Sequence, residues 1–521
     1  MDVKRFLTNH GPGLTSELIE AMTKSGISSA TARQRVTRAQ AQYTRLAGIR
    51  FAKNARFIYL EEQYGGPDFW SAIERAFKAS GQSYWATVVG LKARGGRCPK
   101  SMFPSVCGAP LARNRQLSPD RVLERLCAIQ LLEENTDAAT GETYVQFRPH
   151  SYHKMSEAGL KATLIAEAVA LQAIRQWARR LGFGSYGKFL IRGEDDLPVV
   201  SGVAWDITAP SYMRPLVSAR GGTLKPGFFV CDLNLNGPLD EDAVALFIRK
   251  HDMASAPQNV APILPFLIGE VFTQAAFDLA RKAGIVATTV SDLFGTDVGK
   301  ALRNLIDLLS DAGATAAVNP QHLYNVMAAL TKIEGAADNL RGALFELAIG
   351  SLVKDIEGGY LLTGQKWKDY VTGQSAEVDV LLYIEQENKL LIIECKSKIP
   401  GARVDQTDVE KWYANRVPLI ERLLRQEQRY ASAQIRFELW SNGFFSDDAL
   451  VWLQAQSLEF PTHSLGWKQG NDLKDYARRA PSAAIRKTLN EHYFLHPMAK
   501  IESRRKREAA SSKHDTETSV V

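Results

Sequence analysis

The sequence feature that most constrains the fold of this chain is residues 376–398, AEVDVLLYIEQENKLLIIECKSK. Two apolar runs, at 378–384 and 390–393, flank the polar stretch EQENK, and this pattern predicts two strands joined by a short loop. Side chains alternate between the two faces of a strand. One face of the second strand is therefore expected to carry apolar and charged side chains together, namely Leu390, Ile392, Glu394 and Lys396.

The acidic side chains on these apolar strands need a partner that neutralises them. Glu377 and Asp379 share one face of the first strand, and Glu394 lies on the second. An unpaired buried charge is costly. A divalent metal ion would neutralise the acids, because hard cations such as Mg2+ bind carboxylate and carbonyl oxygens. The alternative is a surface hairpin on which Glu394 and Lys396 form an ion pair.

Asp379 and the triplet Glu394-Cys395-Lys396 resemble the signature of the PD-(D/E)XK nuclease superfamily, in which an Asp precedes an acidic-x-Lys triplet on a neighbouring strand. Val378 stands where that signature usually has a proline. The resemblance implies a restriction-endonuclease-like α/β domain with a mixed sheet flanked by helices. It also implies hydrolysis of phosphodiester bonds, with Mg2+ as the cofactor and Mn2+ as its substitute.

The same resemblance implies roles for individual residues. In such nucleases a glutamate on the helix before the first strand often completes the metal site, and Glu346 in GALFE resembles that element. The metal ligands would be the carboxylates of Asp379, Glu394 and Glu346 and the backbone carbonyl of Cys395. Lys396 would position or deprotonate the attacking water, and its apolar strand and the nearby metal would favour the neutral amine. The alternative for Glu346 is a part in the electrostatics of the helix start.

The segments around the motif predict the rest of such a domain. They read as a helix at 339–354, a strand at 360–363, helices within 404–430, a strand at 434–440 and a helix at 447–453. This order agrees with the restriction-endonuclease-like core. The resemblance covers roughly residues 339–458.

The N-terminal segment predicts a winged-helix-like region that binds nucleic acid. Residues 14–24 have helical spacing, a Ser-Gly pair breaks the pattern, and a second helix is expected from residue 28 or 29 to 46. Residues 49–51 and 56–60 would form the wing. The exposed face of the second helix is expected to carry side chains that bind phosphates and base edges, namely Arg33, Gln34, Thr37, Arg38 and Arg45. The alternative is a small helical domain with a solvated basic face.

The middle of the chain shows a second α/β pattern. Strands are expected at 199–207, 227–235, 262–268 and 285–289, with a helix at 271–282. Three residues fall where the motif residues stand in LIIECKSK and before it: Asp232 for Glu394, Asn234 for Lys396 and Asp206 for Asp379. An asparagine cannot act as a base or supply a cation. We therefore expect a degenerate, non-catalytic nuclease-like fold that shapes a DNA channel or mediates dimerisation, and the alternative is an unrelated domain with two buried acids.

Length and composition bound the remaining possibilities. A chain of 521 residues is expected to form several domains, with boundaries at 1–95, 96–190, 191–300, 301–335, 336–460 and 461–521, the last segment ending in a basic, disordered tail. A net charge of +7 favours an anionic partner. Five scattered cysteines without a CxxC pair favour reduced thiols and a cytoplasmic location. No apolar run approaches the ~18 residues that a membrane span needs.

These observations predict a metal-dependent endonuclease that acts on DNA, most readily on a duplex. A role in bacterial restriction or anti-phage defence is an analogy from the architecture. One alternative is a catalytically inactive, nuclease-like protein that binds DNA or regulates another protein, and a second is an RNA-processing nuclease. Protein partners are left open, with a homodimer among the options.

Overall fold

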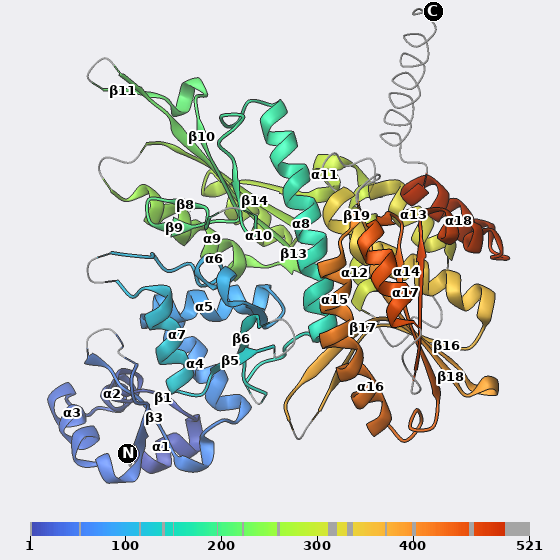
Figure 1. Cartoon of the computed structure of the whole chain (residues 1–521). Coiled ribbons are helices and arrows are strands. Elements are labelled where there is room, and N and C mark those ends of the chain that lie inside the picture. The colour runs from blue at the N-terminus through green and yellow to red at the C-terminus, as the bar shows by residue number, and fades with distance from the viewer. Residues whose placement is uncertain are drawn as a thin grey trace, which may run out of the picture. The chain divides into compact units, whose positions relative to one another are not determined.

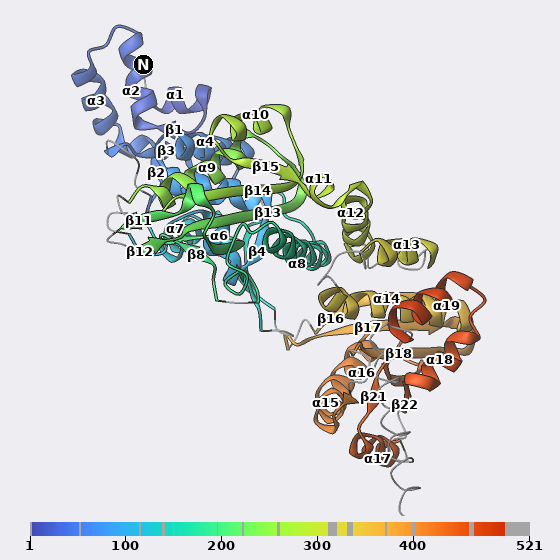
Figure 2. The same ribbon diagram turned by 90° about the horizontal axis from the view of Figure 1, so that it is seen from above.

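The computed structural model is a multidomain α/β protein with mixed sheets flanked by helices, as the sequence predicts. It describes residues 3–49, 51, 54–113, 116–137, 141–149, 151–194, 196–220, 223–257, 261–310, 320–330, 337–369, 372–398, 403–457 and 463–494. The chain forms two compact units, each of which is described by itself: the first contains 1–137, 141–160 and 174–296, and the second 138–140, 161–173 and 297–521. Figures 1 and 2 show the elements. None of the described helices is long and apolar enough to span a membrane.

The first unit begins with three helices and a three-stranded antiparallel sheet of order β1-β3-β2. These elements are α1 (Val3–His10), β1 (Gly13–Leu14), α2 (Thr15–Lys24), α3 (Ser29–Arg38), β2 (Thr44–Arg45) and β3 (Phe57–Tyr59). The second predicted helix is shorter than expected because the buried Tyr43 turns back and donates its hydroxyl to the Val36 carbonyl at 2.9 Å. Arg45 therefore lies on β2 and not on the helix, and the strand that pairs with β3 is 44–45 and not 49–51.

A helical layer and a second small sheet follow. They consist of α4 (Pro67–Ser80), α5 (Gln82–Ala93), β4 (Arg97–Pro99), α6 (Phe103–Cys107), α7 (Pro119–Ala128), β5 (Leu132–Thr136) and β6 (Thr143–Phe147), with strand order β4-β6-β5. The glycines and prolines of segment 94–113 are typical of a loop, but the segment contains β4 and α6. Phe103, Val106 and Cys107 are buried there, so apolar burial outweighs the Gly and Pro content.

The middle sheet has five strands in the order β15-β14-β13-β10-β7. Its strands are β7 (Leu190–Ile191), β10 (Ile207–Ser211), β13 (Gly227–Leu239), β14 (Ile263–Phe272) and β15 (Val286–Thr289). The strands β7, β10 and β13 pair antiparallel, whereas β14 and β15 continue parallel to β13. The expected strand 199–207 is instead a hairpin of β8 (Val199–Val200) and β9 (Val203–Ala204), because Ser201 and Gly202 turn the chain at φ 52° and 78°.

Helices cover both faces of this middle sheet. On one face α9 (Glu241–Ser255) and α10 (Gln274–Lys282) pack against Val230 and Leu267 in one apolar cluster. On the other face Trp177 of α8 (Glu157–Arg180) meets Phe266 with ring centroids 5.6 Å apart. The remaining elements are the hairpin β11 (Ser218–Arg220) and β12 (Thr223–Lys225) and the helix α11 (Val290–Phe294).

The second unit contains the other five-stranded sheet, of order β16-β17-β18-β20-β22. Its strands are β16 (Tyr360–Lys368), β17 (Ser375–Ile384), β18 (Lys389–Lys396), β20 (Gln434–Ser441) and β22 (His463–Gln469). The predicted hairpin is confirmed: β17 and β18 pair antiparallel across a turn that ends at Asn388, whose φ is 47°. β20 and β22 run parallel to β18. β22 lies beyond residue 460, where the sequence predicts the end of this domain, so the sheet is one strand wider than predicted.

Two sets of helices enclose the second sheet (Figure 2). One face meets α15 (Gln406–Lys411), the π-helical turn Trp412–Arg416, α16 (Val417–Gln426) and α17 (Asp447–Gln456). The other face meets α14 (Ala337–Glu357), where Gly350 permits close approach, since a Cβ there would lie 2.8 Å from Thr363 Cγ2. The unit also contains α12 (Thr296–Ser310), α13 (Pro320–Leu330), β19 (Arg403–Val404), β21 (Phe444–Phe445), α18 (Gly470–Arg478), α19 (Ala483–Leu489) and the π-helical turn Asn490–Phe494.

Replacing Phe437 with alanine should destabilise the second unit by about 3–5 kcal/mol, because its ring is fully buried on β20, an inner strand of the sheet. Val451→Ala on α17 is the control, since Val451 is 68% exposed and should change the stability by about 0.5 kcal/mol or less. Urea unfolding followed by tryptophan fluorescence measures both values. Equal midpoints for the two variants would contradict the position of this core.

Candidate active site

The pairing of β17 with β18 brings the predicted acids together. Val380 is opposite Ile393 in the antiparallel register, so Asp379 stands opposite Glu394. The backbone amide of Cys395 donates a hydrogen bond to Asp379 Oδ2 at 2.8 Å. The structure thus places the residues of the motif at one position on the sheet, where the two apolar strands carry them.

Lys396 is part of the same constellation. Its Nζ donates to Glu394 Oε1 at 2.8 Å, and the Glu394 side chain is only 5% exposed. Burial alone would lower the pKa of Lys396, but the Glu394 carboxylate raises it above its ordinary value. A carboxylate at hydrogen-bond distance favours the charged ammonium, whereas the burial of the strand and a nearby metal favour the neutral amine that the sequence analysis expects.

Arg416 is a site residue that the sequence analysis missed. Its Nη1 donates to Glu394 Oε1 at 2.8 Å, and its Nη2 donates to the Glu377 carbonyl at 2.6 Å. It closes the π-helical turn Trp412–Arg416. The 3.6-residue period that predicts which helix residues face the sheet fails across such a turn. The signal available in the sequence was a basic residue near the middle of the expected helical segment 404–430, which follows the motif.

Burial and neighbouring negative charges disfavour the charged form of two acids in the site, Asp379 and Glu346. Burial is the main cause that raises the pKa of Asp379 to about 7, and the Glu394 charge adds to it. Burial also raises the pKa of Glu346 on α14 well above its ordinary value, followed by the charges of Asp379 and Glu377. Glu346 is therefore close enough to the strand acids to be affected by them. Clustered carboxylates of this kind favour a bound cation.

The donor atoms at this position fit a hard divalent cation in kind, since carboxylate oxygens of Asp379 and Glu394 and the Cys395 carbonyl lie at neighbouring positions. The fit is incomplete in the conformation shown. Among the described residues, no group of three or more His, Cys, Asp or Glu side chains is arranged to hold a metal ion. The Glu394 carboxylate contacts Lys396 and Arg416. A metal ion bound by Glu394 would have to replace part of these two contacts.

The predicted nucleic-acid-binding residues lie in the first unit, whereas the acids lie in the second. Arg33, Gln34, Thr37 and Arg38 are exposed on α3, while Ala32 and Val36 are buried on its opposite face. Arg45, the fifth predicted residue, is exposed on β2 and donates to the Tyr43 hydroxyl at 3.3 Å. The basic helical face is thus formed as predicted, except for Arg45.

Comparisons with known proteins leave the chain without an assigned family. No protein-family model matches the sequence, and no curated protein matches it significantly. Among solved structures, the restriction endonuclease MspJI in complex with a 27-mer oligonucleotide aligns over 36% of this chain and 38% of its own, with 16% identity and a TM-score of 0.18. The restriction endonuclease FokI aligns over 83% of this chain and 76% of its own, with 10% identity and a TM-score of 0.18. Similarity at these TM-scores carries no argument about this chain.

In the presence of EDTA, the stability of the second unit should fall as the pH rises from 3.8, the ordinary carboxyl pKa, to about 7, the pKa of folded Asp379. Within this window the folded state binds more protons than the unfolded chain, so the free energy of unfolding decreases with pH. Asp379→Asn removes the charge and can still accept the Cys395 hydrogen bond. Its Tm should exceed that of the wild type above pH 7 by about 2–4 °C for each kcal/mol relieved.

The control is Glu387→Gln, which removes an exposed carboxylate from the turn of the same hairpin. Thermal unfolding across the pH range distinguishes the variants. If the Tm of the wild type and the Tm of Asp379→Asn changed with pH in the same way, the charge of Asp379 would not destabilise the folded state.

Proposed function

We propose that this chain is a metal-dependent endonuclease of the PD-(D/E)XK type that hydrolyses phosphodiester bonds in DNA. One observation carries the proposal: the β17–β18 register sets Asp379 opposite Glu394, with Lys396 2.8 Å from the latter carboxylate. Two acids and a lysine at this spacing supply what phosphodiester hydrolysis requires, namely metal ligands and a cation close to the attacking water. Mg2+ is the proposed cofactor, and Mn2+ its substitute.

Asp379, Glu394, the Cys395 carbonyl and Glu346 would hold the metal, which when bound supplies Lewis-acid polarisation of the phosphate and a water of lowered pKa. The chain's own residues do the rest. The Cys395 amide orients Asp379 through its hydrogen bond, and Arg416 holds Glu394 from the other side. Lys396, whose Nζ donates to Glu394 Oε1, would stabilise the negative charge that develops on the phosphate oxygens.

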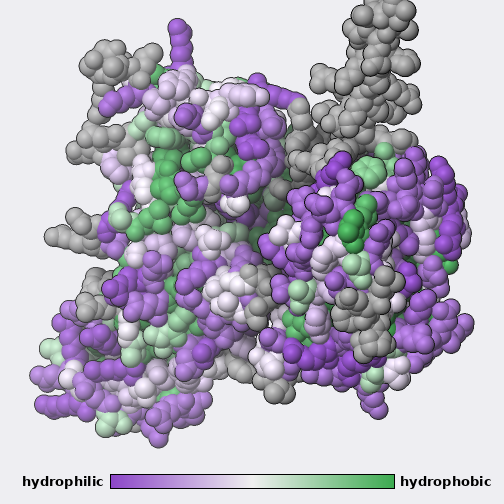
Figure 3. Space-filling model, in the orientation of Figure 1, coloured by the Kyte–Doolittle hydropathy of each residue, from purple (hydrophilic) through white to green (hydrophobic). Residues whose placement is uncertain are grey.

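The N-terminal region is the proposed DNA-binding part. Its order of helices and strands, α1-β1-α2-α3-β2-β3, agrees with a winged helix, and α3 presents arginines on its exposed face. The space-filling view shows a mainly hydrophilic surface over α1, α2 and α3 (Figure 3). A helix with Arg and Gln on its solvent face suits the major groove of a duplex, where such side chains bind phosphates and base edges.

Lys396→Met and Asp379→Asn should each lower the rate of Mg2+-dependent plasmid cleavage about 100-fold or more, because each removes a group that acts on the reacting phosphate. Lys389→Met at the opposite end of β18 is the matched control and should cleave like the wild type. Circular dichroism and DNA binding should stay unchanged in all three. Cleavage by Lys396→Met at the wild-type rate would refute the assignment.

The substrate class is tested by offering the wild type plasmid, single-stranded DNA and RNA, each with Mg2+, Mn2+ or EDTA. Cleavage of DNA that EDTA abolishes is the expected result. Cleavage of RNA alone would favour an RNA-processing nuclease. No cleavage of any substrate, with DNA binding retained, would favour an inactive nuclease-like scaffold.

Replacing Arg33 and Arg38 together with alanine should weaken duplex binding and reduce the slope of log affinity against log salt by about 0.9 for each phosphate that the protein no longer neutralises. Lys24→Ala on α2 removes a comparably exposed cation from the neighbouring helix and serves as the control. Fluorescence anisotropy over a salt series measures both. An unchanged salt slope in the double variant would exclude these arginines from the interface.

A further inference from the structure

The two five-stranded sheets share one topology. The five strands of the middle sheet lie side by side in the order in which the chain reaches them: β7, β10, β13, β14 and β15. In the C-terminal sheet the chain runs β16, β17, β18, β20, β22 in the same spatial order. In both sheets the first three strands are antiparallel and the last two continue parallel to the third.

The correspondence extends to single residues. In the middle sheet Ile207 pairs with Cys231, so Asp206 stands opposite Asp232, as Asp379 stands opposite Glu394. The residue after the second acid donates its amide to the first acid in both sheets: Leu233 to Asp206 Oδ2 at 2.9 Å, and Cys395 to Asp379 Oδ2 at 2.8 Å. Independent folds have no reason to share this register and this hydrogen bond.

The helix after the third strand makes an equivalent contact. In the middle domain Lys250 of α9 donates to Asp232 Oδ2. In the C-terminal domain Arg416 of the π-helical turn donates to Glu394 Oε1. Each cation lies on the connection that leads from the third strand to the fourth, and each binds the second acid of its pair.

We propose that the middle domain is a second copy of the C-terminal fold, whose acid pair is retained but neutralised by the protein's own cations, so that it binds no metal and joins the helices before it to the sheet. This inference depends on the proposed function only in what it predicts for cleavage.

Two differences between the copies bear on metal binding and catalysis. By register, Arg192 faces Asp206 at the position where Gly364 faces Asp379. Arg192 Nε lies 2.7 Å from Asp206 Oδ1, whereas the position of a Cβ on Gly364 is open space. Asn234, within β13, occupies the position of Lys396 in β18. The room that a metal would need beside the first acid is filled by a guanidinium.

A second arginine completes the neutralisation of Asp206. Arg94 Nη2 lies 2.9 Å from Asp206 Oδ2, and the Asp206 side chain is fully buried. Burial alone would raise the pKa of Asp206, but Arg192 and Arg94 together lower it to about 2. The two arginines thus stabilise the charged form of Asp206, whereas burial still raises the pKa of Asp232 above its ordinary value despite the contact with Lys250.

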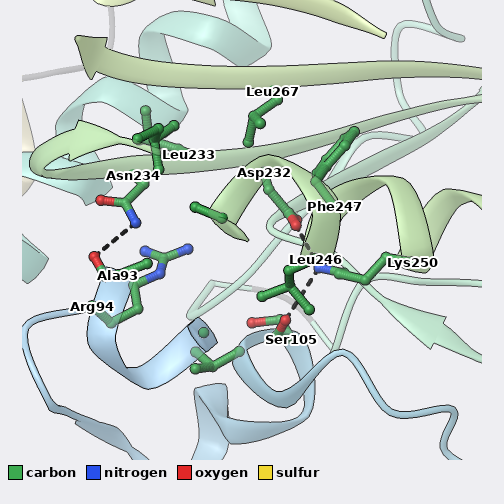
Figure 4. Close-up of a pocket in the computed structure, with 14 residues that line it drawn as sticks. Ala93, Arg94, Ser105, Asp232, Leu233, Asn234, Leu246, Phe247, Lys250 and Leu267 are labelled. Carbon is green, nitrogen blue, oxygen red and sulfur yellow. Dashed lines mark hydrogen bonds and ion pairs between the residues drawn. The ribbon is translucent and has the colours of Figure 1, made fainter. Parts of the chain in front are cut away.

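The side chains around this acid pair connect α5 and α6 to the middle sheet (Figure 4). Besides the Arg94 ion pair at the end of α5, Asn234 Nδ2 donates to the Ala93 carbonyl at 2.8 Å. Lys250, 1% exposed, reaches from Asp232 to the Ser105 carbonyl of α6 at 3.1 Å. These contacts surround a cavity of about 50 Å3, so the acid pair that is proposed to bind metal in one copy contacts neighbouring helices in the other.

The test uses the full chain with Asp232→Asn, Lys250→Met and the two combined. Each single variant leaves one charge of a buried pair unpaired and should lower the Tm by about 10 °C. The combined variant removes both charges and should recover about half of that loss or more. Lys282→Met, an exposed lysine on α10, is the matched control for loss of a positive charge and should leave the Tm within about 2 °C of the wild type. Equal losses in single and combined variants would refute the neutralisation.

Metal binding and cleavage separate this inference from the proposed function. The combined variant should keep the wild-type rise of Tm with Mn2+ and cleave plasmid within about twofold of the wild type. Asp379→Asn should lose both properties. A Mn2+ response that persists in Asp379→Asn and disappears with Asp206→Asn would overturn the inference. Undiminished cleavage by Asp379→Asn, with the combined variant behaving as expected, would refute the proposed function alone.

Discussion

The pairing of β17 with β18 in a single register is the constraint on which the candidate site depends. A slip by one residue would turn every side chain of one strand to the opposite face, so that Asp379 and Glu394 would no longer stand together. The register is kept by apolar side chains, because Leu381 and Ile392 are opposite each other and buried in the core against α15–α17. The residues that form the core therefore also position the acids.

The two buried acid pairs of this chain show opposite charge balances. Asp206 is contacted by Arg94 and Arg192, and Asp232 by Lys250. In the C-terminal site Glu394 has two cationic neighbours, Lys396 and Arg416. The pKa values of Asp379 and Glu346 are nevertheless raised. Functional sites commonly break a local rule of stability in this way, and the structure around them compensates for it.

Sequence reasoning succeeded where a short repeat decides the structure and failed where tertiary contacts do. The alternation of apolar and polar residues predicted the β17–β18 hairpin and the face that carries Glu394. The end of α3 depends on the Tyr43 hydroxyl, which bonds a carbonyl of the preceding helix. The fifth strand, β22, is held by its pairing with β20, and its own segment HSLGWKQ has too few apolar residues to mark it as a strand. Arg416 was missed because a π-helical turn shifts the helical period.

That π-helical turn affects how such a site can change during evolution. The amide of Val417 bonds the carbonyl of Trp412, five residues back, so the turn holds one residue more than an α-helical turn. Trp412, Val417 and Leu424 nevertheless all pack in the same core cluster, so the extra residue is absorbed locally. A one-codon insertion in this crossover helix could therefore bring a guanidinium to an acid on the sheet, and a one-codon deletion could withdraw it. Neither event would alter a strand, so the charge of the site can be inherited separately from the fold that carries it.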